Sequence, residues 1–189
     1  MNAINTPWLI LIVYWVISAF RVRKNKKTEP MASRLAISLV VIGALELLFR
    51  SRFSSATLQD SFMPYMPAVR YLGILLLWGG VAFAIWARYH IGEYWSARVA
   101  VKEDHRVIDS GPYAHIRHPI YSGILLGLIG TALAVGNWRA VVAFLVILVV
   151  LILKARAEEK LLTEQLGNAY VEYKKRTGML IPFSKMASR

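Results

Sequence analysis

Residues 111–123, GPYAHIRHPIYSG, gather polar and aromatic side chains beside an apolar stretch of the chain. Imidazole and guanidinium groups bind anions, whereas phenol rings stack on heterocycles or contact cations. Together these residue types favour a site for an anionic ligand that also carries a flat ring. The side chains that define this site are Tyr113, His115, Arg117, His118 and Tyr121.

A helix is expected to begin at Pro119. Proline suits the first helical position and disfavours a helical backbone in the preceding residue, so His118 is predicted to lie at the cap. The first N–H groups of a helix lack intrahelical partners, and the helix dipole is positive there. We therefore expect an anion-binding site at this helix start, beside His115 and Arg117.

A second polar stretch, RAEEKLL at 156–162, follows another apolar run. Only GNWR at 136–139 separates that run from the apolar run that starts at Ile120, which predicts a tight antiparallel hairpin of helices. The hairpin would return three charged side chains to the face where the preceding helix begins: Arg156, Glu158 and Glu159. A ligand with a carboxylate, an amine and an aromatic base fits such a mouth. S-adenosylmethionine is one such ligand, and NADPH is another, although its phosphates would meet the acidic pair.

Other kinds of site have little support in the sequence. The chain has no cysteine, which excludes disulfides, thiolate metal ligands and a cysteine nucleophile. No common dinucleotide, P-loop, zinc-protease or serine-hydrolase motif is present. The four histidines show no convincing metal spacing, so we expect no metal site: His90, His105, His115 and His118.

The elements that position these residues are those of a small membrane protein. Of the 189 residues, 57% are hydrophobic, and crossing a ~30 Å hydrocarbon core takes roughly 20 apolar residues. Five apolar stretches are long enough, or nearly so when tilt and flanking side chains help. The sequence therefore predicts an all-α polytopic membrane protein with about five transmembrane helices, over Pro7–Phe20, Leu35–Phe49, Tyr71–Ala87, Ile120–Val135 and Ala140–Leu153.

The segments outside these spans have different expected structures. The MPYMP piece makes residues 51–70 unsuited to a helix, and residues 88–119 are expected to form a long cytoplasmic loop that carries binding groups. Residues 154–167 predict an amphipathic, cytoplasmic C-terminal helix. Three small residues in the fourth span permit close approach of another helix: Gly123, Gly127 and Gly130.

Lys and Arg are distributed unevenly between the two faces of this topology. Loop 21–34 holds six, loop 88–119 holds five and the tail from Lys154 holds eight, whereas the segments expected on the other face hold four. The positive-inside rule then places the N-terminus outside and the C-terminus in the cytoplasm. The net charge of +12 follows from this topology and favours contact with anionic membrane lipids, not nucleic-acid binding.

Five ordered blocks of the chain resemble the isoprenylcysteine carboxyl methyltransferase family of membrane methyltransferases. The blocks are IGEYWSARV at 91–99, GPYAHIRHPIYSG at 111–123, RAEEKLL at 156–162, LGNAYVEYKKRTG at 166–178 and LIPF at 180–183. We therefore divide the chain into two regions. Residues 1–69 hold two spans and a basic cytoplasmic loop, and residues 70–189 are the expected catalytic region.

The resemblance implies an enzyme that transfers a methyl group from S-adenosylmethionine to a lipophilic acceptor, a carboxylate of the prenylcysteine type. It implies that the acceptor enters a cytosol-facing pocket from the bilayer. The cofactor would contact Tyr113, His115, Ile116, Arg117, His118, Pro119, Tyr121 and Glu159. Arg156 and Glu158 would be catalytic residues, and Trp95 and Ser96 would line the site of the acceptor. The compact five-span design favours a prokaryotic plasma membrane.

Two other functions are compatible with the same residues. Membrane reductases of sterol or polyprenyl double bonds also carry an RHPxY-type element and use NADPH, so a reductase is the main alternative. A membrane scaffold or small transporter is the second, although the only charge inside a span is Glu46, near its end, which argues against an ion path. Eukaryotic family members have further spans in the amino-terminal half, so the acceptor is not carried over with the family.

Overall fold

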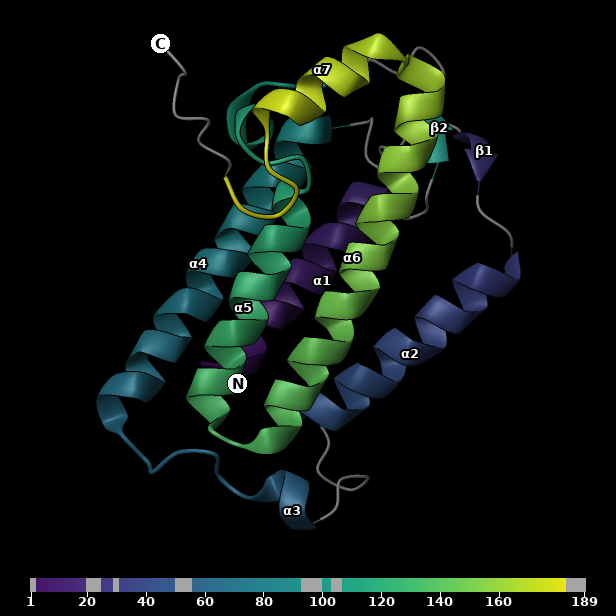
Figure 1. The fold of residues 1–189 in the computed structure, drawn as a ribbon. Helices are drawn as coiled ribbons and strands as arrows, with labels where there is room; N and C mark the ends of the chain where they lie inside the picture. The colour runs from purple at the N-terminus through teal and green to yellow at the C-terminus, as the bar shows by residue number, and fades with distance from the viewer. Residues whose placement is uncertain are drawn as a thin grey trace.

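The computed structural model describes residues 3–19, 25–28, 31–49, 56–92, 100–102 and 107–182, and most of them are helical. The long helices lie side by side, and the last helix crosses one end of the bundle (Figure 1). The helices are α1 (Asn5–Ala19), α2 (Met31–Phe49), α3 (Ala56–Gln59), α4 (Pro67–Ile91), the short 3-10 helix η3 (Gly111–Ala114), α5 (Pro119–Val135), α6 (Trp138–Leu166) and α7 (Asn168–Arg176). Each predicted span coincides with one of the long helices.

Helices α4 and α5 pack more closely than any other pair, and glycines make this approach possible. A Cβ atom added at Gly80 would lie 2.4 Å from the backbone nitrogen of Gly127 and 2.6 Å from the carbonyl oxygen of Gly123. One added at Gly130 would lie 2.5 Å from the carbonyl oxygen of Gly73. The predicted role of the small residues in α5 is therefore confirmed, and their partner is α4.

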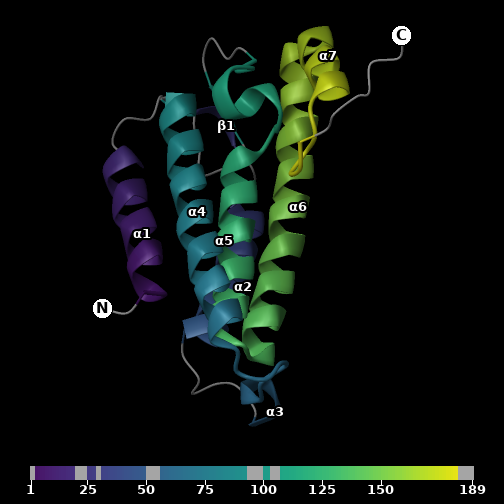
Figure 2. The same ribbon diagram turned by 90° about the vertical axis from the view of Figure 1, so that its left-hand side faces the viewer.

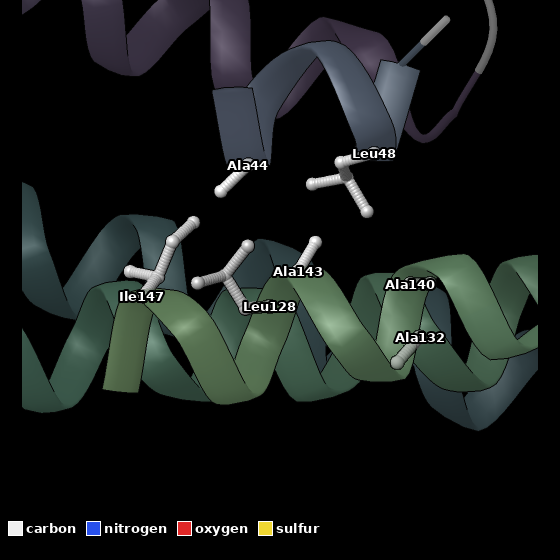
Figure 3. Packing of buried hydrophobic residues seen from close by; sticks show 7 residues of the cluster. All are labelled: Ala44, Leu48, Leu128, Ala132, Ala140, Ala143 and Ile147. Carbon is white, nitrogen blue, oxygen red and sulfur yellow. The ribbon is translucent and has the colours of Figure 1, made fainter. Parts of the chain in front are cut away.

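The predicted hairpin between α5 and α6 is also confirmed. Gly136 ends α5 in a left-handed conformation, with φ of 75°, and α6 begins two residues later. Helix α2 packs against the outer side of this hairpin through Ala44 and Leu48, which face Ala143 (Figure 3). Seen from the side, α5 lies between α4 and α6 (Figure 2). The hairpin thus brings the carboxyl half of α6 back to the end where α5 begins.

Helix α1 is held against this core by two polar contacts. The indole nitrogen of Trp8 donates to the hydroxyl of Thr131 in α5 at 3.1 Å. The buried guanidinium of Arg88 in α4 donates to the carbonyl of Ser18 at 2.9 Å and so satisfies an acceptor at the carboxyl end of α1.

Two connecting segments differ from the sequence prediction. We expected residues 51–70 to be free of helix, but they contain the short helix α3 and the first turn of α4. Pro67 occupies the first position of α4, where the missing N–H of proline has no energetic cost. In addition, β1 (Asn25–Thr28) pairs antiparallel with β2 (Ala100–Lys102). The all-α fold class is confirmed apart from this short pair of strands, which was not predicted because short strands in polar loops leave little hydrophobic pattern to detect.

The surface of the bundle supports the predicted membrane location. Among the described residues, α4 and α6 are each long and apolar enough to cross a membrane, and the apolar parts of α1, α2 and α5 are shorter. Many large apolar side chains are exposed, a surface that lipid chains would cover and water would not. They include Ile17, Leu39, Leu75 and Leu153. That α1, α2 and α5 also cross the membrane stays a prediction.

Candidate active site

The two polar stretches meet where α5 begins. Arg117 precedes α5, and its Nε donates to Oε1 of Glu159 in α6 at 2.6 Å. His118 caps α5, and its Nε2 lies 3.3 Å from the same carboxylate oxygen. Lys174 in α7 approaches the other oxygen, Oε2, at 3.3 Å. The predicted convergence is therefore confirmed in space, with Glu159 as the buried centre of a cluster of cations.

The charge of Glu159 is stabilised by these neighbours. Glu159 lies six residues beyond Leu153, the last residue of the fifth predicted span. Burial alone would raise its pKa, but the proximity of His118 and Arg117 outweighs burial and lowers the pKa to about 2. The carboxylate stays ionised at neutral pH, which makes it an acceptor of hydrogen bonds and a poor general base.

Glu158 belongs to the same cluster but is more accessible. Its Oε1 accepts a hydrogen bond from the Tyr121 hydroxyl at 2.8 Å, and its Oε2 lies 3.5 Å from Nδ1 of His118. The rings of His118 and Tyr121 are parallel, with centroids 5.3 Å apart. The side chain of Glu158 is 18% exposed, against 6% for Glu159. Glu158 and Tyr121 therefore form the open side of the cluster.

One ring nitrogen of His118 is available for a further partner. Nε2 is buried and, among the described residues, makes no hydrogen bond, although it lies near Glu159. A buried polar atom of this kind is costly unless a ligand or water completes its bonding. The open side of the cluster and this nitrogen together mark a site for a polar ligand.

The carboxyl-terminal strap, residues 177–182, crosses the start of α5. The backbone N–H of Arg117 donates to the carbonyl of Gly178 at 2.8 Å, and that of His118 to the carbonyl of Met179 at 3.0 Å. The hydroxyl of Ser122 donates to the carbonyl of Leu180 at 2.6 Å. The strap thus takes up the amides of Arg117 and His118, which precede α5. The anion site was predicted at the first amides of the helix itself, after Pro119, and it stays a prediction.

Helix α7 supports the cluster from the other side. The hydroxyl of Tyr173 donates to the backbone carbonyl of Tyr113 at 2.7 Å, and both rings are buried. Burial raises the pKa of Tyr173 above its ordinary value, so the hydroxyl keeps its proton and remains a donor. The ring of Tyr113 also stacks on His90, with centroids 6.3 Å apart. Tyr113 is thus a supporting residue in this structure and not part of the open side.

The remaining predicted site residues fall into three groups. His115 and Arg156 are exposed, and His115 joins the strap only through its backbone carbonyl, which accepts from Gly178. Ile116 and Pro119 are buried beneath the cluster. Trp95 and Ser96 lie outside the described residues.

Sequence reasoning missed several residues that complete the cluster. Lys174 reaches Glu159 from α7, and the backbone carbonyl of Thr177 accepts from the guanidinium of Arg117. Lys154 places its ammonium 5.8 Å from the ring centroid of Tyr121. Lys174 and Thr177 follow changes of chain direction at Gly167 and Thr177, whose geometry cannot be read from the sequence. Only Lys154, one helical turn before Glu158, could have been found from spacing.

Comparisons with known proteins point to one family. The sequence profile of the isoprenylcysteine carboxyl methyltransferase family matches residues 72–164. The protein-S-isoprenylcysteine O-methyltransferase of Saccharomyces cerevisiae is 36% identical over 115 residues, which are 59% of this chain and 48% of the yeast protein. The probable protein-S-isoprenylcysteine O-methyltransferase of Oryza sativa subsp. indica is 28% identical over 173 residues, 90% of this chain and 88% of the rice protein.

A solved structure shares the fold. The eukaryotic intramembrane Ras methyltransferase ICMT superposes with a TM-score of 0.55 at 20% sequence identity, over 82% of this chain and 54% of that one. The chain thus spans about half the length of the yeast protein and of this structure. The matches support the methyltransferase interpretation and give no support to the reductase alternative.

Proposed function

Because residues 72–164 match the isoprenylcysteine carboxyl methyltransferase family, we propose that the chain is an integral membrane methyltransferase of that family. Its methyl donor would be S-adenosylmethionine, and its acceptor a lipophilic carboxylate of the prenylcysteine type. One observation carries the proposal: the start of α5 and the Glu158–Glu159 pair of α6 form one cluster with an open, polar side. These two stretches also lie within the region that the family profile matches.

The residues of the open side fit the methyl donor. Its amino group needs a carboxylate, which Glu158 offers, and its carboxylate needs donors, which we assign to the first amides of α5 after Pro119, with His118 beside them. Its adenine or sulfonium would lie beside the ring of Tyr121. When bound, the donor supplies a methyl group on a good leaving group. The protein therefore has to align, hold and desolvate the reactants.

Buried members of the cluster have a positioning role in this proposal. Arg117 donates to Glu159 and to the backbone carbonyls of Lys174 and Thr177, so its guanidinium joins α5, α6 and the strap. Glu159 in turn faces Arg117, Lys174 and the imidazole of His118. Direct contact of Arg117 and Glu159 with the cofactor, as the sequence predicted, stays a prediction; their contacts support the task of holding His118 in place.

The acceptor determines whether a base is needed. A carboxylate reacts as the anion, so neither Glu158 nor His115 has to remove a proton. A thiol or amine acceptor would need such a base, and Glu158 is the better placed of the two. Arg156, Trp95 and Ser96 keep their predicted roles near the acceptor as part of this proposal.

The proposal includes the membrane topology. Five spans, α1, α2, α4, α5 and α6, would place the cluster at the cytoplasmic face, with the N-terminus outside. The clustering of Lys and Arg in the segments on that side supports this orientation. A prokaryotic plasma membrane remains our expectation for the source.

Ligand binding to the full chain in lipid nanodiscs tests the function. We expect S-adenosylmethionine and its demethylated product to bind by calorimetry and NADPH not to bind. Both Glu158→Gln and His118→Ala should weaken binding at least about tenfold, because each removes one charge-assisted hydrogen bond. Glu164→Gln, which alters an exposed carboxylate on the same helix, should bind normally.

A transfer assay completes the test. Radiolabelled methyl should pass from the donor to N-acetyl-S-farnesylcysteine in the wild type. Binding of NADPH alone would replace the proposal by the reductase. Binding of the methyl donor with transfer only to thiols or amines would keep the methyltransferase and reject the carboxylate acceptor.

A further inference from the structure

Lys154 lies at the boundary between the apolar and polar parts of α6. It directly follows Leu153, the last residue of the fifth predicted span, and precedes Glu158 by one helical turn. Its side chain is half-buried, and its ammonium lies 5.8 Å from the ring centroid of Tyr121. This is the first cation that a molecule would meet on moving along α6 from the hydrocarbon core toward the cluster.

The ring of Tyr121 occupies the same boundary. On one side it packs against an apolar cluster formed by Ala87, Tyr113 and Ile120. On the other, its hydroxyl donates to Glu158 and its ring stacks on His118. A molecule with an apolar chain and a charged head could therefore lie with the chain against apolar side chains and the head beside Tyr121.

We infer that Lys154 binds the carboxylate of the lipophilic acceptor and selects anionic acceptors over neutral ones. This inference rests on the proposed function. The ammonium is a point charge on a flexible stem, so it can follow the head group while its methylenes stay in apolar surroundings. An ammonium has three N–H donors, so Lys154 can bind a head group in addition to its contacts within the protein.

The same contact would favour substrate over product. Methylation forms a carboxylate oxygen–methyl bond, breaks the sulfur–methyl bond of the donor and moves no proton. The acceptor changes from an anion to a neutral ester, whose attraction to Lys154 is much weaker. Lys154 therefore holds the acceptor before transfer and releases the ester after it.

Binding without any methyl donor tests the inference directly. The probes are N-acetyl-S-farnesylcysteine, its carboxamide and its methyl ester, in nanodiscs of neutral phosphatidylcholine. The wild type should bind the carboxylate at least about tenfold more tightly than either neutral probe, as expected for a charge-assisted contact. Lys154→Met should remove this preference, and Lys154→Arg should keep most of it. Lys160→Met, an exposed lysine of the same helix, is the matched control.

Kinetics separate this role from others. In Lys154→Met we expect the KM for the acceptor to rise about tenfold, while kcat and the affinity for S-adenosylmethionine change little. Weaker binding of S-adenosylmethionine would assign Lys154 to the carboxylate of the donor instead. An effect that appears only when phosphatidylglycerol is added would make Lys154 a lipid anchor. Either result overturns the inference.

Failure of the inference is distinguishable from failure of the proposed function. If the wild type methylates the carboxylate probe but binds the carboxamide equally well, only the role of Lys154 is rejected. If it binds no S-adenosylmethionine, the function is rejected as well. Lys154→Arg retains the length and charge of the side chain, so it reports on recognition even if Lys154→Met is unstable.

Discussion

The first turn of α5 and the rest of the same helix are held by different kinds of contact. Along most of its length α5 meets α4 through glycines, so that backbone lies against backbone. A charged side chain joins this contact only near the far end, where Arg70 donates to the carbonyl of Ala134 at 3.4 Å. At its start, Arg117 and His118 meet two glutamates and the carbonyls of the strap. Both regions are closely packed. The contact between α4 and α5 depends on the small volume of glycine, whereas the contacts at the first turn of α5 depend on charge.

This difference separates two tasks. The glycine contacts fix the position of α5 relative to α4, because backbone atoms cannot move aside as side chains can. The charged cluster then fixes the orientation of the few side chains that face a ligand. A change of volume should therefore damage the helix pair, whereas a change of charge should damage the site, and the substitutions below test that division.

The largest effect is expected for Glu159→Gln. The substitution keeps the volume but removes the charge that faces Arg117, His118 and Lys174. Leaving the shielded guanidinium of Arg117 without its partner should cost about 3 kcal/mol of unfolding free energy, and binding of the methyl donor should be lost. Thermal unfolding in detergent and calorimetry measure the two effects. Glu164→Gln is the control, and an unchanged site in Glu159→Gln would contradict the dependence on charge.

A somewhat smaller effect is expected for Gly80→Ala. The added methyl group would lie 2.4 Å from the backbone nitrogen of Gly127, so the helices must separate. Overpacking of this kind costs about 2 kcal/mol. The neighbouring substitution Gly79→Ala has no atom within 4 Å of the new Cβ and should leave the unfolding midpoint nearly unchanged. Equal loss of stability in both variants would contradict the α4–α5 contact as the cause, because alanine has the higher helix propensity and should not destabilise α4 by itself.

Acid should reproduce part of the Glu159→Gln effect. The pKa of this carboxyl is lowered from 4.5 to about 2 in the folded protein. Its contribution to stability is therefore fully present above pH 4.5 and is lost as the pH falls toward 2. The difference in unfolding midpoint between the wild type and Glu159→Gln should shrink across this interval. Because other carboxyls titrate in the same range, the measurement compares the unfolding midpoint of the wild type with that of Glu159→Gln at each pH.

Much of this arrangement could be predicted from the sequence because it depends on local features. Pro119 fixes the start of α5, and the four residues 136–139 leave room only for a hairpin, so the meeting of Arg117 with Glu159 follows from topology. The small residues of α5 indicate close packing without naming the partner. That partner, α4, depends on long-range geometry that a single sequence does not contain.

The parts that could not be predicted involve backbone groups and distant segments. Nothing in the composition of residues 177–182 shows that their carbonyls bind the amides of Arg117 and His118, since any residue could supply a carbonyl. The approach of Lys174 depends on the turn at Gly167, where φ is 55°. The pairing of β1 with β2 likewise joins two loops that are far apart in the chain.

The smallest effect is expected for Tyr173→Phe, which removes a neutral hydrogen bond between α7 and η3, close to the charged first turn of α5. The lost hydroxyl leaves the buried carbonyl of Tyr113 without this donor, at a cost of about 1 kcal/mol, or roughly 2–4 °C in unfolding midpoint. Tyr65→Phe, at an exposed position, is the control. Because Tyr173 supports η3 and does not face the open side of the cluster, affinity for the methyl donor should fall less than about threefold. If affinity for the methyl donor fell as far as in Glu159→Gln, the packing of α7, and not the charge of the cluster, would determine the geometry of the site. The distinction between the first turn of α5 and the rest of the helix would then no longer hold.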